Sequence, residues 1–336
     1  MPLDMLSRAV ILVGGPGTRL RPLTYVVPKA MVPVLNRPFL EHTIAYLGKY
    51  GVSDIVLALN YMPDAIREHF GDGSACRTNL AYCIEAEPLG TAGAVKNAES
   101  YLEGTFVVLN GDVFSEIDLA DMLDFHRRSR AQATIALTWV DNPGAFGAVE
   151  TEPNGRVRRF VEKPSPGEVS THWINAGIYI LETELLRRVP LGRHYMFESG
   201  LFPRMLELGE PLYGYPSRGY WMDMGTPGKY LKLNCDLLAS GAAGGAGEVI
   251  CGADAVIHPS VRLTPPVLVG DDGRIDEVAV ITGPVVIGDG CRIAAGATLE
   301  RAVVWTGANI EAGAEIKDGI VIRDPDGRDQ VIAAGS

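Results

Sequence analysis

The chain predicts a mixed α/β domain with a mostly parallel sheet, followed by a β-solenoid. Apolar strands alternate with amphipathic helices up to residue 238, and a six-residue repeat begins after residue 249. Between them, residues 239–248 are mostly Gly and Ala, which is the composition of a flexible linker. We therefore expect one domain over 1–238, a linker over 239–248 and a second domain over 249–336.

The elements of the first domain follow in order. Residues 8–13 form an apolar strand that ends in Gly14-Gly15, and Leu40, Ile44 and Leu47 share one face of a helix. Such alternation produces a Rossmann-like sheet with helices on both faces, and ligands bind at the carboxyl ends of its strands. Further strands are expected over 55–59, 80–84 and 106–109, and further helices over 63–70 and 91–101. Gly14-Gly15 and Gly111-Asp112 both fall at such strand ends.

The repeat of the second domain has a period of six residues. Apolar residues recur from Ile257 to Leu299, slip by one position, and resume from Val304 to Ile322. A helix needs a period of 3.6, so this pattern favours short strands, about three to a coil. It resembles the hexapeptide repeats of left-handed β-helices, with about four coils. The flat faces of such a solenoid could pack tail to tail, which predicts a homo-oligomer.

The bulk composition limits the partners and the compartment. The chain has 336 residues, of which 30 are Lys or Arg and 41 are Asp or Glu, for a net charge of −11. This balance argues against nucleic acid or an anionic membrane as the main partner, but a few local cations can still hold a nucleotide. The five cysteines form no CxxC pair, and no apolar run is long enough for a signal peptide or a membrane helix. We therefore expect a cytoplasmic protein.

The loop after the first strand predicts a phosphate site. Its sequence is Gly14-Gly15-Pro16-Gly17-Thr18-Arg19, and glycines there let backbone N–H groups approach a phosphate. A P-loop would need a Lys that is absent, and a dinucleotide fingerprint would need glycine where Leu20 stands. The loop instead carries Arg19, and Lys29 follows shortly after. Both cations could neutralise the charge that builds on departing pyrophosphate.

This loop and several later segments resemble the signatures of one family. They are Gly14 to Thr24, Pro28 to Val34, Glu87 to Gly93, Asn110-Gly111-Asp112, Phe160 to Pro164, Asn175-Ala176-Gly177 and Trp221 to Pro227. Together they resemble the sugar-nucleotide pyrophosphorylase (nucleotidyltransferase) family, most closely its mannose-1-phosphate guanylyltransferase branch. The resemblance implies that a sugar-1-phosphate oxygen attacks the α-phosphorus of a nucleoside triphosphate and releases pyrophosphate. Because a phosphate monoester is already an anion near neutral pH, no general base is demanded.

The resemblance also implies roles for the matched residues. Asp112 and Asp223 would hold Mg²⁺, which takes one or two carboxylates and fills its shell with phosphates and water. Arg19, Lys29 and Lys163 would complete the catalytic set, with Lys163 on the sugar phosphate. The nucleotide-binding set is Leu12, Gly14, Gly15, Gly17, Thr18, Gly90, Thr91 and Asn110, and the sugar-binding set is Gly147, Glu162, Lys163 and Asn175.

Three alternatives stay open. The favoured substrates are GTP and mannose 1-phosphate, but Met31 stands where guanylyltransferases often have Leu, and Met196 to Gly200 departs from the family's Ser-x-Glu pattern. A glucose-1-phosphate uridylyl- or thymidylyltransferase is therefore the alternative. A non-catalytic regulatory paralogue is a second possibility, although the five catalytic residues are all present. A tail that transfers acyl groups is a third, but the repeats carry no convincing catalytic constellation.

Overall fold

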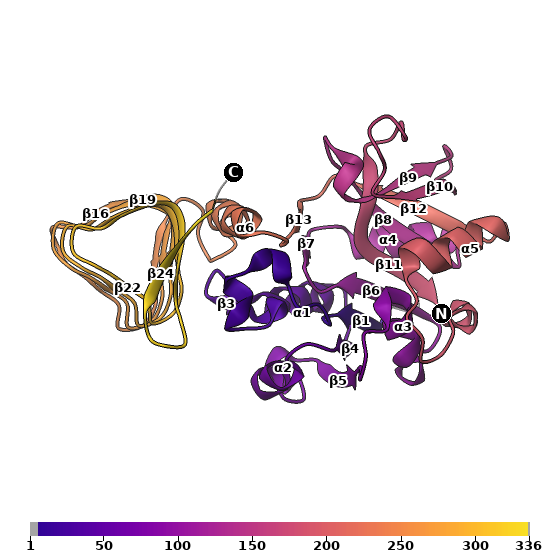
Figure 1. Ribbon diagram of the computed structural model, residues 1–336, viewed down its shortest axis with the longest axis horizontal. Helices are drawn as coiled ribbons and strands as arrows, with labels where there is room; N and C mark the ends of the chain where they lie inside the picture. Colours follow the sequence, from indigo (N-terminus) through magenta and orange to yellow (C-terminus); the bar gives the residue numbers. More distant parts are fainter. Residues whose placement is uncertain (1–5, 335–336) are drawn as a thin grey trace. The chain divides into compact units, whose positions relative to one another are not determined.

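The computed structural model describes residues 6–334, which divide into two units (Figure 1). The first unit contains the chain up to Gly15 and Leu40–Met222, and the second contains Pro16–Phe39 and the chain from Asp223 onward. The segment Pro16–Phe39 thus groups with the C-terminal part of the chain. The domain boundaries expected near residues 238 and 249 stay a prediction.

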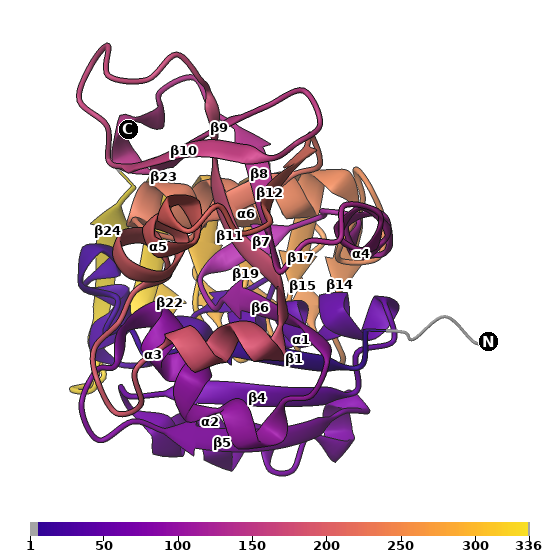
Figure 2. The ribbon, with the colours of Figure 1, turned by 90° about the vertical axis from the view of Figure 1, so that its right-hand side faces the viewer.

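The first unit is built on a nine-stranded sheet, shown in Figure 2. Its main path runs β10-β9-β11-β6-β1-β4-β5, and β8 joins β11 to β12. β1 is parallel to β4 and β6, β4 is parallel to β5, and β11 is antiparallel to β6, so the expected Rossmann-like α/β fold is confirmed. The strands are β1 (Arg8–Leu12), β4 (Asp54–Leu59), β5 (Asn79–Ile84), β6 (Thr105–Asn110), β8 (Ala133–Trp139), β9 (Gly147–Thr151), β10 (Val157–Glu162), β11 (Trp173–Glu182) and β12 (Leu212–Ser217).

The observed helices agree with the prediction where apolar residues recur at helical spacing. In α1, Leu40 is 0 % exposed, Ile44 is 3 % and Leu47 is 0 %, as a helix with one buried face requires. The expected helix over 91–101 is wrong at its end, since α3 stops at Asn97 and a separate 3-10 turn covers Glu99–Tyr101. The helices are α1 (Phe39–Lys49), α2 (Pro63–Phe70), α3 (Gly90–Asn97), α4 (Leu119–Arg128) and α5 (Phe202–Glu207), with a π-helical turn over Phe197–Leu201.

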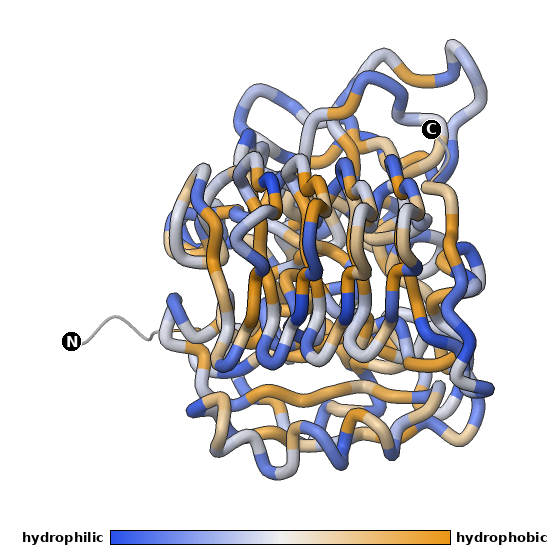
Figure 3. The backbone as a smooth tube through the Cα atoms, turned by 90° about the vertical axis from the view of Figure 1, so that its left-hand side faces the viewer, coloured by the Kyte–Doolittle hydropathy of each residue, from blue (hydrophilic) through white to orange (hydrophobic). Residues whose placement is uncertain are grey.

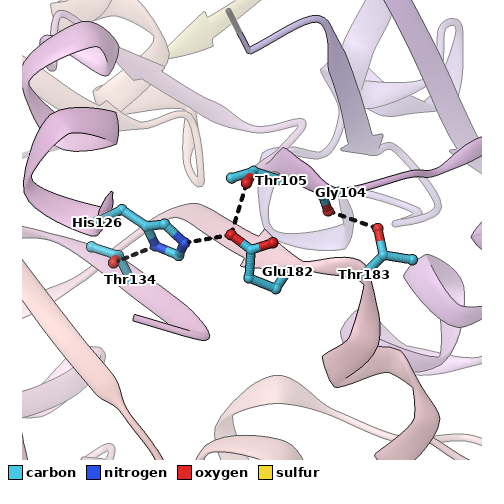
Figure 4. A network of polar contacts seen from close by, with 6 residues as sticks. All are labelled: Gly104, Thr105, His126, Thr134, Glu182 and Thr183. Atoms are coloured by element: carbon cyan, nitrogen blue, oxygen red, sulfur yellow. Dashed lines mark hydrogen bonds and ion pairs between the residues drawn. The ribbon is translucent and has the colours of Figure 1, made fainter. Parts of the chain in front are cut away.

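A buried polar network joins α4 to three strands of the sheet (Figure 4). His126 is 1 % exposed; its Nδ1 lies 2.8 Å from Thr134 Oγ1 and its Nε2 lies 3.1 Å from Glu182 Oε1. Thr105 Oγ1 donates to the same carboxylate oxygen at 2.7 Å. These bonds, that from His126 foremost, outweigh burial and lower the pKa of Glu182. The network therefore ties α4, β6, β8 and β11 together inside the first unit.

The second unit begins with the segment Pro16–Phe39, which has little regular secondary structure. It contains three single-turn 3-10 helices and a two-residue-loop hairpin. They are η1 (Thr18–Leu20), η2 (Leu23–Tyr25), η3 (Lys29–Met31), β2 (Pro33–Val34) and β3 (Arg37–Pro38). Helix α6 (Pro227–Ser240) follows Asp223, and its N-cap Thr226 accepts a hydrogen bond from Lys229 N.

The rest of the second unit is a β-helix of short strands, which are parallel except that β24 pairs antiparallel with β23 (Figure 1). Its sheets run β14-β17-β19-β21-β23-β24, with β16 on β19, and β15-β18-β20-β22. Hydrogen-bonded neighbours lie 18 residues apart at Asp271 and Asp289, but Arg301 meets Asp318 after 17 residues, which confirms the slip of one. The strands are β14 (Val249–Cys251), β15 (Val256–Ile257), β16 (Arg262–Thr264), β17 (Val267–Val269), β18 (Arg274–Ile275), β19 (Val280–Ile287), β20 (Arg292–Ile293), β21 (Thr298–Val304), β22 (Asn309–Ile310), β23 (Glu315–Arg323) and β24 (Asp329–Ala333).

The six-residue repeat fills the interior of the β-helix. Ile281, Ile287 and Ile293 are each 0 % exposed, and Figure 3 shows apolar and polar stretches alternating along successive coils. This is the burial that a solenoid requires, because each coil covers its apolar side chains only with those of its neighbours. Within residues 6–334, every helix is too short or too polar to cross a bilayer.

Candidate active site

In the first unit, the carboxyl ends of β1 and β6 place several of the predicted residues side by side. Leu12 is in register with Asn110, and Gly111 N donates to Leu12 O at 2.9 Å. A Cβ on Gly111 would lie 2.7 Å from Leu12 O, so only glycine allows this approach. Asp112 comes directly after this contact, at the strand edge where ligands of such sheets bind.

Asn110 carries a buried polar atom that the protein leaves unsatisfied. Among the described residues, nothing donates a hydrogen bond to Asn110 Oδ1. Gly177, with φ of 73°, lies against the other side of the amide, and a Cβ there would be 2.7 Å from Asn110 Nδ2. A buried acceptor without a donor costs about 1–3 kcal/mol, so this oxygen suits a ligand or water that brings a donor.

A chain of hydrogen bonds links the predicted nucleotide residue Thr91 to the predicted sugar residue Asn175. Thr91 Oγ1 donates to Glu198 Oε2 at 3.0 Å and accepts from Phe197 N at 2.8 Å. Tyr179 OH lies 3.4 Å from Glu198 Oε1 and accepts from Asn175 Nδ2 at 2.8 Å. Burial above all raises the pKa of Tyr179 far above its ordinary value, so its hydroxyl stays protonated.

Glu198 is the residue that sequence reasoning missed. It lies on the π-helical turn Phe197–Leu201 and is half-buried between Thr91 and Tyr179. The sequence did carry a signal, because an acidic residue stands in the segment where the family has its Ser-x-Glu pattern. The residues around Glu198 differ from that pattern, so the segment alone did not identify the acid.

Glu162 and Gly147 face each other across the β9–β10 pair. A Cβ on Gly147 would lie 2.8 Å from Glu162 Oε2 and 2.6 Å from Phe160 Cζ, so glycine makes room for both side chains. Partial burial of the carboxylate, and then the charge of Glu198, raise the pKa of Glu162, while Lys163 acts in the opposite direction. Glu162 and Glu198 therefore belong to one electrostatic cluster.

The loop before α3 holds Gly90 and Thr91 in a fixed conformation. Glu85 is 8 % exposed and its Oε2 accepts from Leu89 N at 2.8 Å. Gly90 has φ of 72°, and a Cβ there would meet Met196 Sδ at 2.8 Å. The loop is thus packed too closely for any side chain at this position.

In the second unit, Lys29 packs closely against the glycine-rich segment that carries Arg19. Gly17 has φ of 62°, and a Cβ there would lie 2.9 Å from Thr24 Cγ2 and 3.1 Å from Lys29 Cβ. Thr24 Oγ1 donates to Gly17 O at 2.9 Å, which fixes the turn. Thr18 and Arg19 are exposed on η1, so their side chains are available to a ligand.

Gly225 brings Asp223 and Arg19 to one point of the second unit. A Cβ on Gly225 would lie 2.8 Å from Asp223 Oδ2 and 3.6 Å from Arg19 Cζ. Asp223 is 9 % exposed and forms an ion pair with Lys229 of α6. Arg19, Lys29 and Asp223, three of the five predicted catalytic residues, therefore lie in the same unit.

The carboxylates fit a hard divalent cation. Within residues 6–334 no group of three or more His, Cys, Asp or Glu could hold a metal ion by itself. Mg²⁺ needs only one or two carboxylates when substrate phosphates complete its shell, so Asp112 and Asp223 are a sufficient donor set. Asp112 lies in the first unit and Asp223 in the second, and a metal site shared by the two stays a prediction.

Comparison with known proteins finds a family and several relatives that this chain is similar to. A family model described as nucleotidyl transferase matches residues 8–240. A mannose-1-phosphate guanylyltransferase of Mycobacterium tuberculosis is 39% identical over 316 residues, covering 92% of this chain and 82% of that protein. A mannose-1-phosphate guanyltransferase of Schizosaccharomyces pombe is 39% identical over 78% of this chain and 73% of its own length.

A solved structure is similar as well. HddC from Yersinia pseudotuberculosis, described in complex with GMP-PN, aligns with a TM-score of 0.60 and 31% identity over 68% of this chain and 98% of that one.

Proposed function

Because this chain belongs to the nucleotidyl transferase family, we propose that it is a mannose-1-phosphate guanylyltransferase, which converts mannose 1-phosphate and GTP to GDP-mannose and pyrophosphate. The observation that carries the proposal is the similarity to a mannose-1-phosphate guanylyltransferase along 92% of this chain. The similarity to a protein described in complex with GMP-PN supports a guanine nucleotide as one substrate.

The roles of the residues follow from their charges and positions. Arg19 and Lys29 neutralise the charge that develops on the leaving pyrophosphate. Asn110 Oδ1, which is buried without a donor within residues 6–334, accepts a hydrogen bond from the nucleotide. Leu12, Gly14, Gly15, Gly90 and Thr91 line the base and ribose, and Gly17 and Thr18 the phosphates.

The sugar phosphate is held by the cluster of Glu162, Lys163, Asn175 and Gly147. Lys163 neutralises the sugar phosphate so that two anions can approach, and Glu162 and Asn175 hydrogen-bond the sugar hydroxyls. The attacking phosphate oxygen is already ionised, so the protein aligns the two substrates and moves no proton. Asp112 and Asp223 would hold Mg²⁺, which would supply positive charge to the phosphates.

A substrate panel tests the proposal. Purified protein with Mg²⁺ is offered mannose 1-phosphate with GTP, and glucose 1-phosphate with UTP or dTTP, and pyrophosphate release is measured. We expect turnover to be highest with the first pair. Higher turnover with glucose 1-phosphate would establish the alternative activity, and no release with any pair would establish a non-catalytic paralogue.

Two further expectations go with this function. The flat sides of the β-helix pair the chain with further copies of itself, and the enzyme works in the cytoplasm where its sugar phosphate and nucleotide are found. Light scattering of the purified full-length chain measures the first expectation, and the mass of a single chain would contradict it.

A further inference from the structure

One tyrosine hydroxyl joins three distant segments of the second unit. Tyr230 lies in α6 and is 0 % exposed; its hydroxyl donates to Pro33 O at 2.6 Å. The same hydroxyl accepts a hydrogen bond from Trp305 Nε1 at 2.8 Å. Trp305 comes directly after β21 of the β-helix and is 8 % exposed. The β-helix, α6 and the glycine-rich segment therefore meet at one buried oxygen.

Two asparagines add links between the same parts. Asn234 of α6 is 0 % exposed, its Oδ1 accepts from Leu35 N at 2.9 Å, and its Nδ2 donates to Tyr230 O at 3.0 Å. Asn36 Nδ2 donates to Ile287 O at 2.8 Å, at the end of β19. Helix α6 itself packs against β19, β21 and β23 of the β-helix (Figure 1).

The anchored turn is conformationally strained. Leu35 has φ of 49° and Asn36 has φ of 61°, and a left-handed conformation costs a leucine about 1–2 kcal/mol. Leu35 is nevertheless 6 % exposed and held by Asn234. Such strain persists only where the surroundings impose it, so the hairpin depends on α6 and the β-helix for its geometry.

The anchored hairpin continues directly from Lys29. Val32 N donates to Lys29 O at 3.2 Å and Phe39 N donates to Val32 O at 3.0 Å, so η3 and the hairpin share hydrogen bonds. Lys29 in turn packs against Gly17, two residues before Arg19. A displacement at Pro33 would reach both cations through a few rigid contacts.

We propose that Trp305 and Tyr230 are positioning residues through which the β-helix holds the segment Pro16–Phe39 in place and thereby sets the handling of the nucleoside triphosphate. The catalytic part of this inference rests on the proposed function. The reacting groups of phosphoryl transfer need alignment, and a misplacement of about 1 Å can cost a hundredfold in rate. The β-helix thus has a task within each chain, separate from any assembly of chains.

The test uses the full-length variants Tyr230→Phe, Trp305→Phe and the double variant. Tyr230→Phe leaves Pro33 O and Trp305 Nε1 without their shared partner, whereas Trp305→Phe removes one donor only. We expect Tyr230→Phe to lower kcat/KM for GTP by about tenfold and Trp305→Phe by about threefold, with KM for mannose 1-phosphate unchanged within twofold. Because both act through one hydroxyl, the double variant should match Tyr230→Phe.

The matched control is Tyr46→Phe, which removes a hydroxyl-to-carbonyl bond of 2.6 Å to Ile117 O in the first unit. It should leave kcat/KM for GTP unchanged within twofold. Ordinary loss of stability would lower the thermal midpoint in both tyrosine variants, but it would not separate the two substrates. Equal effects on both substrates, or wild-type kinetics in Tyr230→Phe, would overturn the proposal.

Hydrogen exchange separates this inference from the proposed function. Amides of Met31, Val32 and Leu35 should exchange at least about tenfold faster in Tyr230→Phe than in the wild type, whether or not the protein turns over any substrate. Unchanged exchange there would overturn the positioning role in an active enzyme. Faster exchange in a protein that releases no pyrophosphate would overturn the proposed function and leave the mechanical link established.

Discussion

The two units hold their predicted functional residues in different ways. In the first unit, Asn110 is the last residue of a buried strand of a large sheet, Asp112 follows that strand, and Asn175 comes from the strand beside it. In the second unit, Arg19 and Lys29 lie on single 3-10 turns and not on a strand. Their support comes from α6 and the β-helix, about two hundred residues later. A sheet edge is therefore a local scaffold, whereas the glycine-rich segment depends on distant parts of the chain.

The largest effect should come from the carboxylates that the two units contribute separately. Asp112→Asn and Asp223→Asn should each lower kcat by about a hundredfold or more, because each removes one of the two carboxylates proposed to hold Mg²⁺. Steady-state pyrophosphate release over a Mg²⁺ titration measures this.

Asp64→Asn is the control for both variants, since its side chain is 83% exposed and only faces Arg67 at 3.8 Å. It should keep full activity. A near-normal rate in Asp112→Asn or Asp223→Asn would remove that residue from the metal site.

The next effect should distinguish the two units by which substrate's binding is impaired. Gly17→Ala places a methyl group 2.9 Å from Thr24 and 3.1 Å from Lys29, so KM for GTP should rise by about tenfold. Gly177→Ala places one 2.7 Å from Asn110 Nδ2, beside Asn175, so it should impair both the nucleotide and the sugar phosphate.

Gly104→Ala is the matched control for both glycine variants. It has the same φ of 62° as Gly17, but a Cβ there meets nothing within 4 Å. It should cost stability through backbone strain alone and leave both KM values unchanged. If Gly104→Ala changed KM for GTP as much as Gly17→Ala, strain and not close packing would explain the result.

A smaller effect should appear on the acid side of the pH profile of kcat/KM for mannose 1-phosphate. The charge of Glu198 helps to raise the pKa of Glu162, so Glu198→Gln should lower that pKa toward its ordinary value. Glu162 would then stay ionised to lower pH. The acid limb of kcat/KM for mannose 1-phosphate should move to lower pH, together with a rise of several-fold in KM.

The pH profile of Glu162→Gln identifies the titrating group. If Glu162 is responsible, its variant loses the acid limb, and adding Glu198→Gln to it produces no further shift. An unchanged acid limb in Glu198→Gln alone would show that the two carboxylates do not interact.

The sequence predicted those features of the fold that depend on local pattern. The strand ending at Leu12 and the strand ending at Asn110 could be located from apolar runs, and the slip of the six-residue repeat could be located from spacing. It did not predict the strands from residue 133 to 182, among which β11 pairs with β6 and β8 over long separations that local pattern does not encode. Glu198 reaches Thr91 across 107 residues, a contact that no local pattern encodes. For the same reason the bond from Tyr230 to Pro33 could not be foreseen.

The smallest effect concerns stability and should be confined to the first unit. Glu182 has a pKa below its unfolded value because His126 and Thr105 hydrogen-bond the ionised carboxylate. A lowered folded pKa stabilises the fold above the unfolded pKa, which is about 4.3, and this stabilisation is lost as pH falls through the folded pKa. Glu182→Gln should therefore lower the thermal midpoint of the first unit by about 3–6 °C at pH 7.

The dependence on pH distinguishes this charge effect from simple loss of packing. The difference in midpoint between wild type and Glu182→Gln should shrink as the pH falls through the lowered pKa of Glu182, because the wild-type carboxylate becomes protonated there. Glu103→Gln is the control, because Glu103 is 82% exposed and its ion pair with Arg8 contributes little. Calorimetry at several pH values measures both variants. Among the described residues, the hydrogen bonds of this network join only parts of the first unit. The unfolding of the second unit should therefore stay unchanged, and a shared shift would mean that the two units unfold as one.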